Sequence, residues 1–325
     1  MKHFLQAAVS AVTLIAAAPP VIAQEATQLL FSDVTTADAP RSQALVDIFA
    51  REIGEEFAFV PYFGGTLTAQ GSELAAIQRG NLQMALLPPS DLAQQAPEFS
   101  ILSAAYLVRD AEHLESIFAS EVGDTLRQIA RDELGVEILA PAYYGTRHVN
   151  LRGDKHIETP EDMQGITLRM PDGDAWQFLG EAIGATATPM AYAEVYTGLQ
   201  TGVIDAQDNP LPNNQLMKFH EVTDQIILTG HNVGFGMLLI SADLFDTLTE
   251  EQQARMRDAA HDAFEWSTEQ YLIQEAELVE YFRNEGLEVY TPDVEAFRVF
   301  AQDKYLNSGF SADWPDGMLE QINAL

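Results

Sequence analysis

The segment from Thr249 to Gly286 limits most strongly what this chain can fold into. Gln252 follows Thr249 at the spacing of a helix-capping box, and no glycine or proline occurs before Gly286. At about 1.5 Å per residue, one helix over this segment would be roughly 55 Å long. A lobe of about 150 residues has a radius of gyration near 15 Å. The segment therefore predicts a single helix that runs along two lobes; the alternative is two helices with a break near Trp266 and Ser267.

Short β-like runs alternate with amphipathic helical patterns in the rest of the chain, which is typical of an α/β fold. The first series predicts strands at 27–34, 57–63 and 82–88 and helices at 41–54 and 72–80. The second series starts near 136–145, with predicted strands at 147–152, 166–171, 225–230 and 234–241, helices at 173–184 and 193–202, and an extended run at 203–210.

Two lobes are expected from these two series and from the length of 325 residues. We assign residues 24–145 and approximately 235–272 to lobe I, and residues 146–234 and approximately 273–325 to lobe II. No stretch rich in proline, glycine and serine separates the two series. The lobes are therefore expected to be joined by ordinary crossing strands.

Residues 1–23 have the composition of a secretory signal peptide. Lys2 and His3 precede an apolar run from Leu5 to Ala18, and a small-residue cleavage pattern ends at Ala23. The run is shorter than the roughly 20 residues of a membrane-spanning helix. The chain has no cysteine, so it offers no disulfide, thiolate metal site or cysteine for a lipid anchor. These features predict an exported, periplasmic protein that does not insert into the membrane.

The charge balance excludes several partners. The chain has 17 Lys+Arg against 49 Asp+Glu and a formal net charge of -32, which repels nucleic acid and anionic membrane surfaces. An anionic ligand would need a local group of arginines. No nucleophile elbow, phosphate loop, zinc-protease motif or dinucleotide fingerprint is present, and no histidines have metal-ligand spacing, so neither a cofactor nor a metal is predicted.

Arginines are concentrated at the start of the second series. Arg147, Arg152 and Arg169 lie on two predicted strands. In "ITLRMP" the alternation puts Arg169 on the face opposite Leu168, near the carboxyl end of the strand, where open α/β sheets bind their ligands. A guanidinium binds a carboxylate through two charge-assisted hydrogen bonds. A structural ion pair with one of the many acidic residues is the alternative, and the pattern alone leaves both open.

A second group of candidates follows in "PMAYAEVYTGLQTGVIDAQDNP". Tyr192 and Tyr196 are four residues apart, a spacing that puts two aromatic rings on one helical face, where they can pack on a ligand. Asn209, held extended before Pro210, can donate and accept hydrogen bonds. Core packing for the tyrosines and a turn for the asparagine are the alternatives.

Three segments resemble the signature region of a known family. "GITLRMP", "GATATPMAYAEVYTGLQTGVIDAQDNP" and "KFHEVTDQIILTGH" are similar to the extracytoplasmic solute receptors of TRAP transporters, the DctP-like family. "GGTLTAQGSELAAIQRGNLQMA" looks like the first-lobe segment of that family, and the resemblance covers nearly all of residues 27–325. It implies a two-lobed α/β fold of the periplasmic-binding-protein type, with a hinged ligand cleft, a long helix spanning both lobes and no catalytic activity.

The resemblance also implies roles for individual residues. Arg169 matches the arginine that pairs with the ligand carboxylate, and Asn209 matches the asparagine that helps to hold it. Tyr192 stands where the family keeps a binding-site aromatic. Arg147 matches a second arginine of members that bind sugar acids, although its spacing to Arg169 differs slightly. Glu73 is the first-lobe candidate.

The implied function is that of a periplasmic receptor for a small organic acid, a C4-dicarboxylate or a sugar acid such as a hexuronate. The receptor would deliver the acid to the membrane permease subunits of a TRAP transporter. Ala206 replaces a usual glycine of the family motif, and Asp208 is the acid before the asparagine; neither removes a ligand-contacting group. The alternatives are a receptor of an ABC-type importer, or a secreted sugar-acid hydrolase or isomerase that uses Arg169 as a clamp and Glu73 or a histidine as a base.

Overall fold

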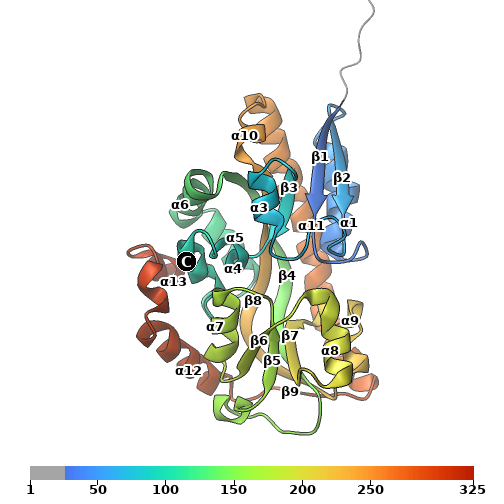
Figure 1. The fold of residues 1–325 in the computed structure, drawn as a ribbon, viewed down its shortest axis with the longest axis vertical. Helices are drawn as coiled ribbons and strands as arrows, with labels where there is room; N and C mark the ends of the chain where they lie inside the picture. Colours follow the sequence, from blue (N-terminus) through green and yellow to red (C-terminus); the bar gives the residue numbers. More distant parts are fainter. Residues whose placement is uncertain (1–25) are drawn as a thin grey trace, which may run out of the picture.

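The computed structural model describes residues 26–325, and the predicted signal peptide at 1–23 lies outside the described residues. A nine-stranded mixed sheet has the order β2-β1-β3-β8-β4-β7-β5-β6, with β9 paired to β8 (Figure 1). The strands are β1 Thr27–Ser32, β2 Phe57–Tyr62, β3 Met84–Leu87, β4 Val136–Leu151, β5 Thr167–Met170, β6 Thr186–Pro189, β7 Ala206–Pro210, β8 Gln225–Ser241 and β9 Glu288–Tyr290.

Helices pack around this sheet. They are α1 Pro40–Ala44, α2 Ala50–Glu52, α3 Glu73–Gln78, α4 Pro89–Leu92, α5 Ala111–Phe118, α6 Glu121–Ile129, α7 Asp174–Ala182, α8 Val195–Thr201, α9 Leu211–Leu216, α10 Ala242–Phe245, α11 Glu250–Asn284, α12 Val294–Asn307 and α13 Met318–Ala324. A π-helical turn, Leu45–Phe49, joins α1 to α2, so the predicted helix at 41–54 is present as one continuous helical segment.

The long strands β4 and β8 form an antiparallel pair along the whole molecule (Figure 1). Strands β1, β2 and β3 lie at one end of this pair and β5, β6 and β7 at the other. We call residues 26–135 the β1–β3 half and residues 152–224 the β5–β7 half. Because β4 and β8 cross between the halves, the connection is made by strands, as the sequence predicts.

Helix α11 is one uninterrupted helix of 35 residues, so the prediction of a single helix is confirmed and the break near Trp266 is wrong. Thr249 and Gln252 form the expected capping box, and Gly286 follows the helix at φ 96°. The helix packs along β4, against α1 at one end and β9 at the other (Figure 1). It therefore supports both halves.

Two pairs of predicted strands are continuous in the structure. The run at 136–145 and the predicted strand at 225–230 do not end at Gly145 and Gly230, because both glycines adopt positive φ inside β4 and β8, at 115° and 56°. The register between the two strands shifts between Tyr143 and Gly145, which marks a bulge. Glycine at such a point bends a strand without ending it.

The main hydrophobic core is continuous between the halves. Its buried members include Phe31 and Phe49 near β1, and Leu168 and Leu179 on β5 and α7. Each such side chain contributes about 1.5–3 kcal/mol when it is removed from water. Among residues 26–325, no helix combines the length and the apolar character needed to cross a bilayer.

Candidate functional site

A cavity lies between the two halves. Its wall includes residues of the loops after β1 and β3 on one side and the carboxyl ends of β5 and β7 on the other. All five predicted site residues, Glu73, Arg147, Arg169, Tyr192 and Asn209, line it. The structure thus brings together side chains that are up to 136 positions apart in the sequence.

Arg169 is the most unusual group in this wall. It is 1% exposed, and its Nε donates a 2.8 Å hydrogen bond to the carbonyl of Met190. Its Nη2 is buried and has no hydrogen-bond partner in the described part of the chain. Burial lowers the pKa of Arg169 to about 10, and Arg147 acts in the same direction while Asp208 opposes it. The side chain is therefore a buried cation with an unused donor, next to a cavity.

Arg147, by contrast, is already paired. Its Nε and Nη2 donate to the two carboxylate oxygens of Asp208 at 2.7 and 2.9 Å, and Nη2 also donates to the Asp208 carbonyl. The ring of His231 lies 3.0 Å from the same carboxylate. Burial acts to raise the pKa of Asp208, but Arg147 and His231 outweigh it and hold this pKa below the usual range. The guanidinium of Arg147 lies 5.0 Å from the Trp176 ring.

A third arginine of the wall, Arg41, was not singled out from the sequence. Its Nε and Nη2 donate to Asp33 at 2.9 and 3.3 Å, and its guanidinium lies 4.0 Å from the Tyr144 ring. Arg152, the third member of the sequence cluster, is exposed and does not line the cavity. The sequence offered little sign that Arg41 lines the cavity. Its partner Asp33 lies eight residues earlier in a loop, so the only local signal was the position of Arg41 at the start of a helical pattern.

Tyr192 and Asn209 form part of a polar network on the wall of the β5–β7 half. Asn213 Nδ2 donates to the Tyr192 hydroxyl at 3.3 Å, and Asn209 Nδ2 donates to Gln207 at 2.5 Å. The Tyr192 ring faces Arg169, whose guanidinium carbon lies 5.7 Å from the ring centre. Tyr196 lies outside the wall, and its hydroxyl donates to Glu221 instead. The predicted pairing of two tyrosines on one ligand face is therefore wrong.

Three acidic side chains line the wall of the β1–β3 half: Asp33, which is paired with Arg41, and the unpaired Glu73 and Asp91. Glu73, at the start of α3, is 1% exposed, and burial raises its pKa to about 7, with a further contribution from Asp91. Asp91 in α4 is half-buried, and burial raises its pKa to about 6 against the effect of the hydrogen bond from Trp176. The sequence contained no signal for Asp91 or Trp176.

Hydrogen bonds connect the halves across the cavity. The indole Nε1 of Trp176 donates to Asp91 Oδ1 at 2.9 Å, and the backbone N–H of Tyr192 donates to Gln70 Oε1 at 2.7 Å. Trp176 and Tyr192 belong to the β5–β7 half, whereas Asp91 and Gln70 belong to the β1–β3 half. The cavity is thus closed on these sides by direct contacts between the halves.

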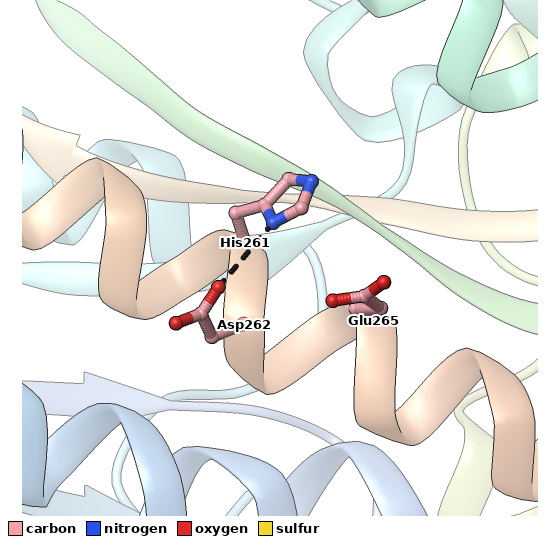
Figure 2. Close-up of side chains that lie close together, drawn as sticks. All are labelled: His261, Asp262 and Glu265. Carbon is pink, nitrogen blue, oxygen red and sulfur yellow. Dashed lines mark ion pairs between the residues drawn. The ribbon is translucent and has the colours of Figure 1, made fainter.

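A separate group of possible metal ligands lies on α11, away from the cavity. His261, Asp262 and Glu265 are close together and all exposed, and Nδ1 of His261 lies 3.5 Å from Asp262 Oδ1 (Figure 2). Glu115 of α5 approaches the same histidine at 3.8 Å. Exposed acidic groups of this kind are common on a chain of such negative charge, and nothing at this group indicates a bound ion.

The sequence profile of the family described as DctP, bacterial extracellular solute-binding protein, family 7, matches residues 31–310. The chain belongs to this family. A TRAP periplasmic solute-binding protein from Roseobacter denitrificans, solved with bound 3-deoxy-D-manno-oct-2-ulosonic acid, is 43% identical, with a TM-score of 0.91 over 92% of this chain and 99% of that chain.

Other relatives of this DctP-family protein are more distant. The sialic acid-binding periplasmic protein of Vibrio cholerae is 28% identical over 94% of each chain. A TRAP periplasmic solute-binding protein from Xanthobacter autotrophicus, solved with bound β-D-galacturonate, is 26% identical, with a TM-score of 0.83 over 91% of this chain and 99% of that chain.

Membership confirms the predicted family, fold class and type of protein. The DctP-family protein is a periplasmic solute-binding protein of TRAP transport and not an enzyme. The periplasmic location predicted from residues 1–23 agrees with the extracellular character of the family. The alternatives of a sugar-acid hydrolase and of an ABC-type receptor are therefore wrong.

Proposed function

We propose that this DctP-family protein binds a sugar acid in the cavity between its halves and delivers it to the membrane permease of a TRAP transporter. One observation carries the proposal: the Arg169 guanidinium is buried beside the cavity, its Nη2 has no partner in the described residues, and no ion pair there includes it. A buried unpaired charge is costly unless a ligand pairs with it. A carboxylate supplies both the charge and two acceptor oxygens.

The other predicted residues have distinct roles in this proposal. Asn209, at the end of β7, donates to the same carboxylate through its amide Nδ2. Arg147 is held by Asp208, so it contributes through its remaining Nη1 and through the positive potential beside Arg169. The Tyr192 ring packs on the body of the ligand, and Glu73 contacts its far end.

Two of the solved relatives support a sugar acid as the ligand. The Roseobacter denitrificans protein holds an eight-carbon sugar acid, and the Xanthobacter autotrophicus protein holds a hexuronate. The polar groups of the wall include Asn213 and Asn232, which suit the hydroxyls of such a ligand.

The two halves then act as hinged lobes. We propose the division given by the sequence, with 24–145 and approximately 235–272 in lobe I and 146–234 and approximately 273–325 in lobe II. A ligand that touches both lobes favours the closed arrangement because it binds that arrangement better.

A thermal-shift screen tests the proposal. The panel contains 3-deoxy-D-manno-oct-2-ulosonate, D-galacturonate, D-glucuronate, D-galactonate and succinate, with D-galactose as the neutral control. At 100 times its Kd, a ligand stabilises the folded protein by about 2.7 kcal/mol. At least one sugar acid should do so, and galactose should not. Stabilisation by galactose but by none of the acids would refute the proposal.

A further inference from the structure

The wall of the cavity has two chemically different sides. On the β5–β7 side, Arg169 and Asn209 stand at the carboxyl ends of parallel strands. On the β1–β3 side, Glu73 and Asp91 face the same space. A ligand that reaches from one side to the other therefore meets Arg169 and Asn209 at one end. At the other end it meets these two acids beside the ion pair of Asp33 and Arg41.

Neither acid on the β1–β3 side is neutralised by a neighbour. None of the ion pairs formed within residues 26–325 includes Glu73 or Asp91. Glu73 Oε2 is buried and has no hydrogen-bond partner in that part of the chain. Asp91 accepts from the Trp176 indole through Oδ1 only, which leaves Oδ2 available. Both side chains thus present unused carboxyl oxygens to the ligand space.

The charges around the two acids are negative at Glu73 and mixed at Asp91. Asp33 and Asp91 both act on Glu73, and Asp172 acts on Asp91. Arg41 is tied to Asp33 by their ion pair, and Arg169 influences Asp91 without forming an ion pair with it. A hydroxyl group can donate to the free oxygens here, whereas a carboxylate would add a further like charge in a dry site.

We propose that Glu73 and Asp91 form a hydroxyl subsite that makes the cavity selective for sugar acids with a single carboxylate and excludes aldaric acids, which carry a carboxylate at each end. The inference rests on the proposed function, since it assumes that Arg169 holds the one carboxylate. It adds Asp91 as a determinant of specificity and removes long dicarboxylates from the possible ligands.

D-Galactonate and galactarate are a matched pair of probes, because they have the same configuration at four carbons and differ only in a terminal CH₂OH or carboxylate. Calorimetry should show that the wild-type protein binds galactonate at least 30-fold more tightly than galactarate. In the double variant Glu73→Gln, Asp91→Asn, this ratio should fall at least tenfold. Glu115→Gln, which removes an exposed charge on α5, is the control and should leave the ratio unchanged.

Equal affinity of the wild-type protein for the two probes, or the same ratio in the double variant, would overturn the subsite. So would the absence of galactonate binding at millimolar concentration while other sugar acids bind. Failure of the proposed function gives a different result, since then no sugar acid of the screen stabilises the wild-type protein. Thermal unfolding of each unliganded variant shows whether it is folded.

Discussion

Trp176 Nε1 donates a 2.9 Å hydrogen bond to Asp91 Oδ1 and so joins helix α7 of the β5–β7 half to helix α4 of the β1–β3 half. The bond from the Tyr192 N–H to Gln70 makes a second link. Because these links cross the cavity, they form only when the halves are together. They belong to the closing motion that we propose, and each can be removed without touching the hinge strands.

Trp176→Phe should weaken ligand binding by about 10- to 100-fold. The substitution keeps an aromatic ring beside Arg147 but removes the donor to Asp91, and a hydrogen bond to a charged group contributes about 1.5–3 kcal/mol. Calorimetry with the best sugar acid of the screen measures the loss. Trp314→Phe is the matched control, since that indole donates to Ser100 outside the cavity wall. Equal affinities of the two variants would contradict the role of the link.

Arg169→Gln should abolish binding of every acid without reducing the stability of the free protein. Two charge-assisted hydrogen bonds to a carboxylate contribute about 3–6 kcal/mol, so the affinity should fall by at least 100-fold. The free protein loses a buried cation whose charged form burial disfavours, and the glutamine amide can replace the hydrogen bond from Arg169 Nε to the Met190 carbonyl. Calorimetry and urea unfolding measure the two effects, and Arg152→Gln, an exposed site, is the control. Unchanged affinity in Arg169→Gln would contradict the anchoring role.

Arg147→Gln, in contrast to Arg169→Gln, should lower the stability of the unliganded protein. Its removal leaves the buried Asp208 carboxylate without its ion-pair partner, which typically costs about 3–5 kcal/mol. Urea unfolding of the unliganded variants should therefore rank Arg147→Gln well below Arg169→Gln. The opposite order would mean that Arg147 is the ligand anchor and Arg169 the structural cation.

The sequence was sufficient to place Arg169 at the ligand-binding edge of the sheet, because the signals for that position lie in the neighbouring residues. Strand alternation around Leu168 and the end of the strand at Pro171 put the arginine at a sheet edge. The family resemblance then pointed to Asn209 and Tyr192, which line the same wall. These residues lie within 40 positions of one another, so a single segment of the sequence carries most of the β5–β7 side.

The cavity residues of the β1–β3 side could not be predicted from one segment of the sequence. Arg41 and Asp91 come from short helices after different strands, and only the fold brings them to one cavity. The contact between Asp91 and Trp176 joins residues 85 positions apart. The continuity of β4 through Gly145 and of β8 through Gly230 was missed for another reason, because a glycine that ends a strand and one that bends it look alike in a sequence.

The stability of the unliganded protein should depend on Glu73 in a defined pH range. Its pKa is raised from 4.5 to about 7, so its contribution to stability is full below pH 4.5 and is lost as the pH rises through about 7. At about 1.4 kcal/mol per pH unit, Glu73→Gln should be more stable than the wild type by about 2–3 kcal/mol at pH 8 and no more stable at pH 4.5. Urea unfolding at the two pH values measures this, with Glu115→Gln as the control. The same difference in unfolding free energy between Glu73→Gln and the wild type at both pH values would contradict the raised pKa of Glu73.

Gly145→Ala should destabilise the protein more than Gly230→Ala. An alanine Cβ at position 145 would lie 2.9 Å from Pro210 Cβ and 3.0 Å from Glu275 Oε1, at a φ of 115°. At Gly230 the φ is 56° and the nearest atom is 3.8 Å away, so the cost there is limited to the left-handed backbone. The Glu275 carboxylate also accepts from the Thr146 N–H at 2.6 Å, so displacing it disturbs the bulge of β4 between the halves.

We expect a loss of about 2–4 kcal/mol for Gly145→Ala and about 1 kcal/mol for Gly230→Ala, since strained backbone positions cost about 1–3 kcal/mol each and steric overlap adds to this. Urea unfolding gives both values. Small-angle scattering with and without the sugar acid then shows whether the bulge also serves as a hinge, because compaction on binding should be smaller in Gly145→Ala than in Gly230→Ala. Equal stability and equal compaction of the two variants would remove Gly145 from the hinge and leave it as an ordinary strand residue.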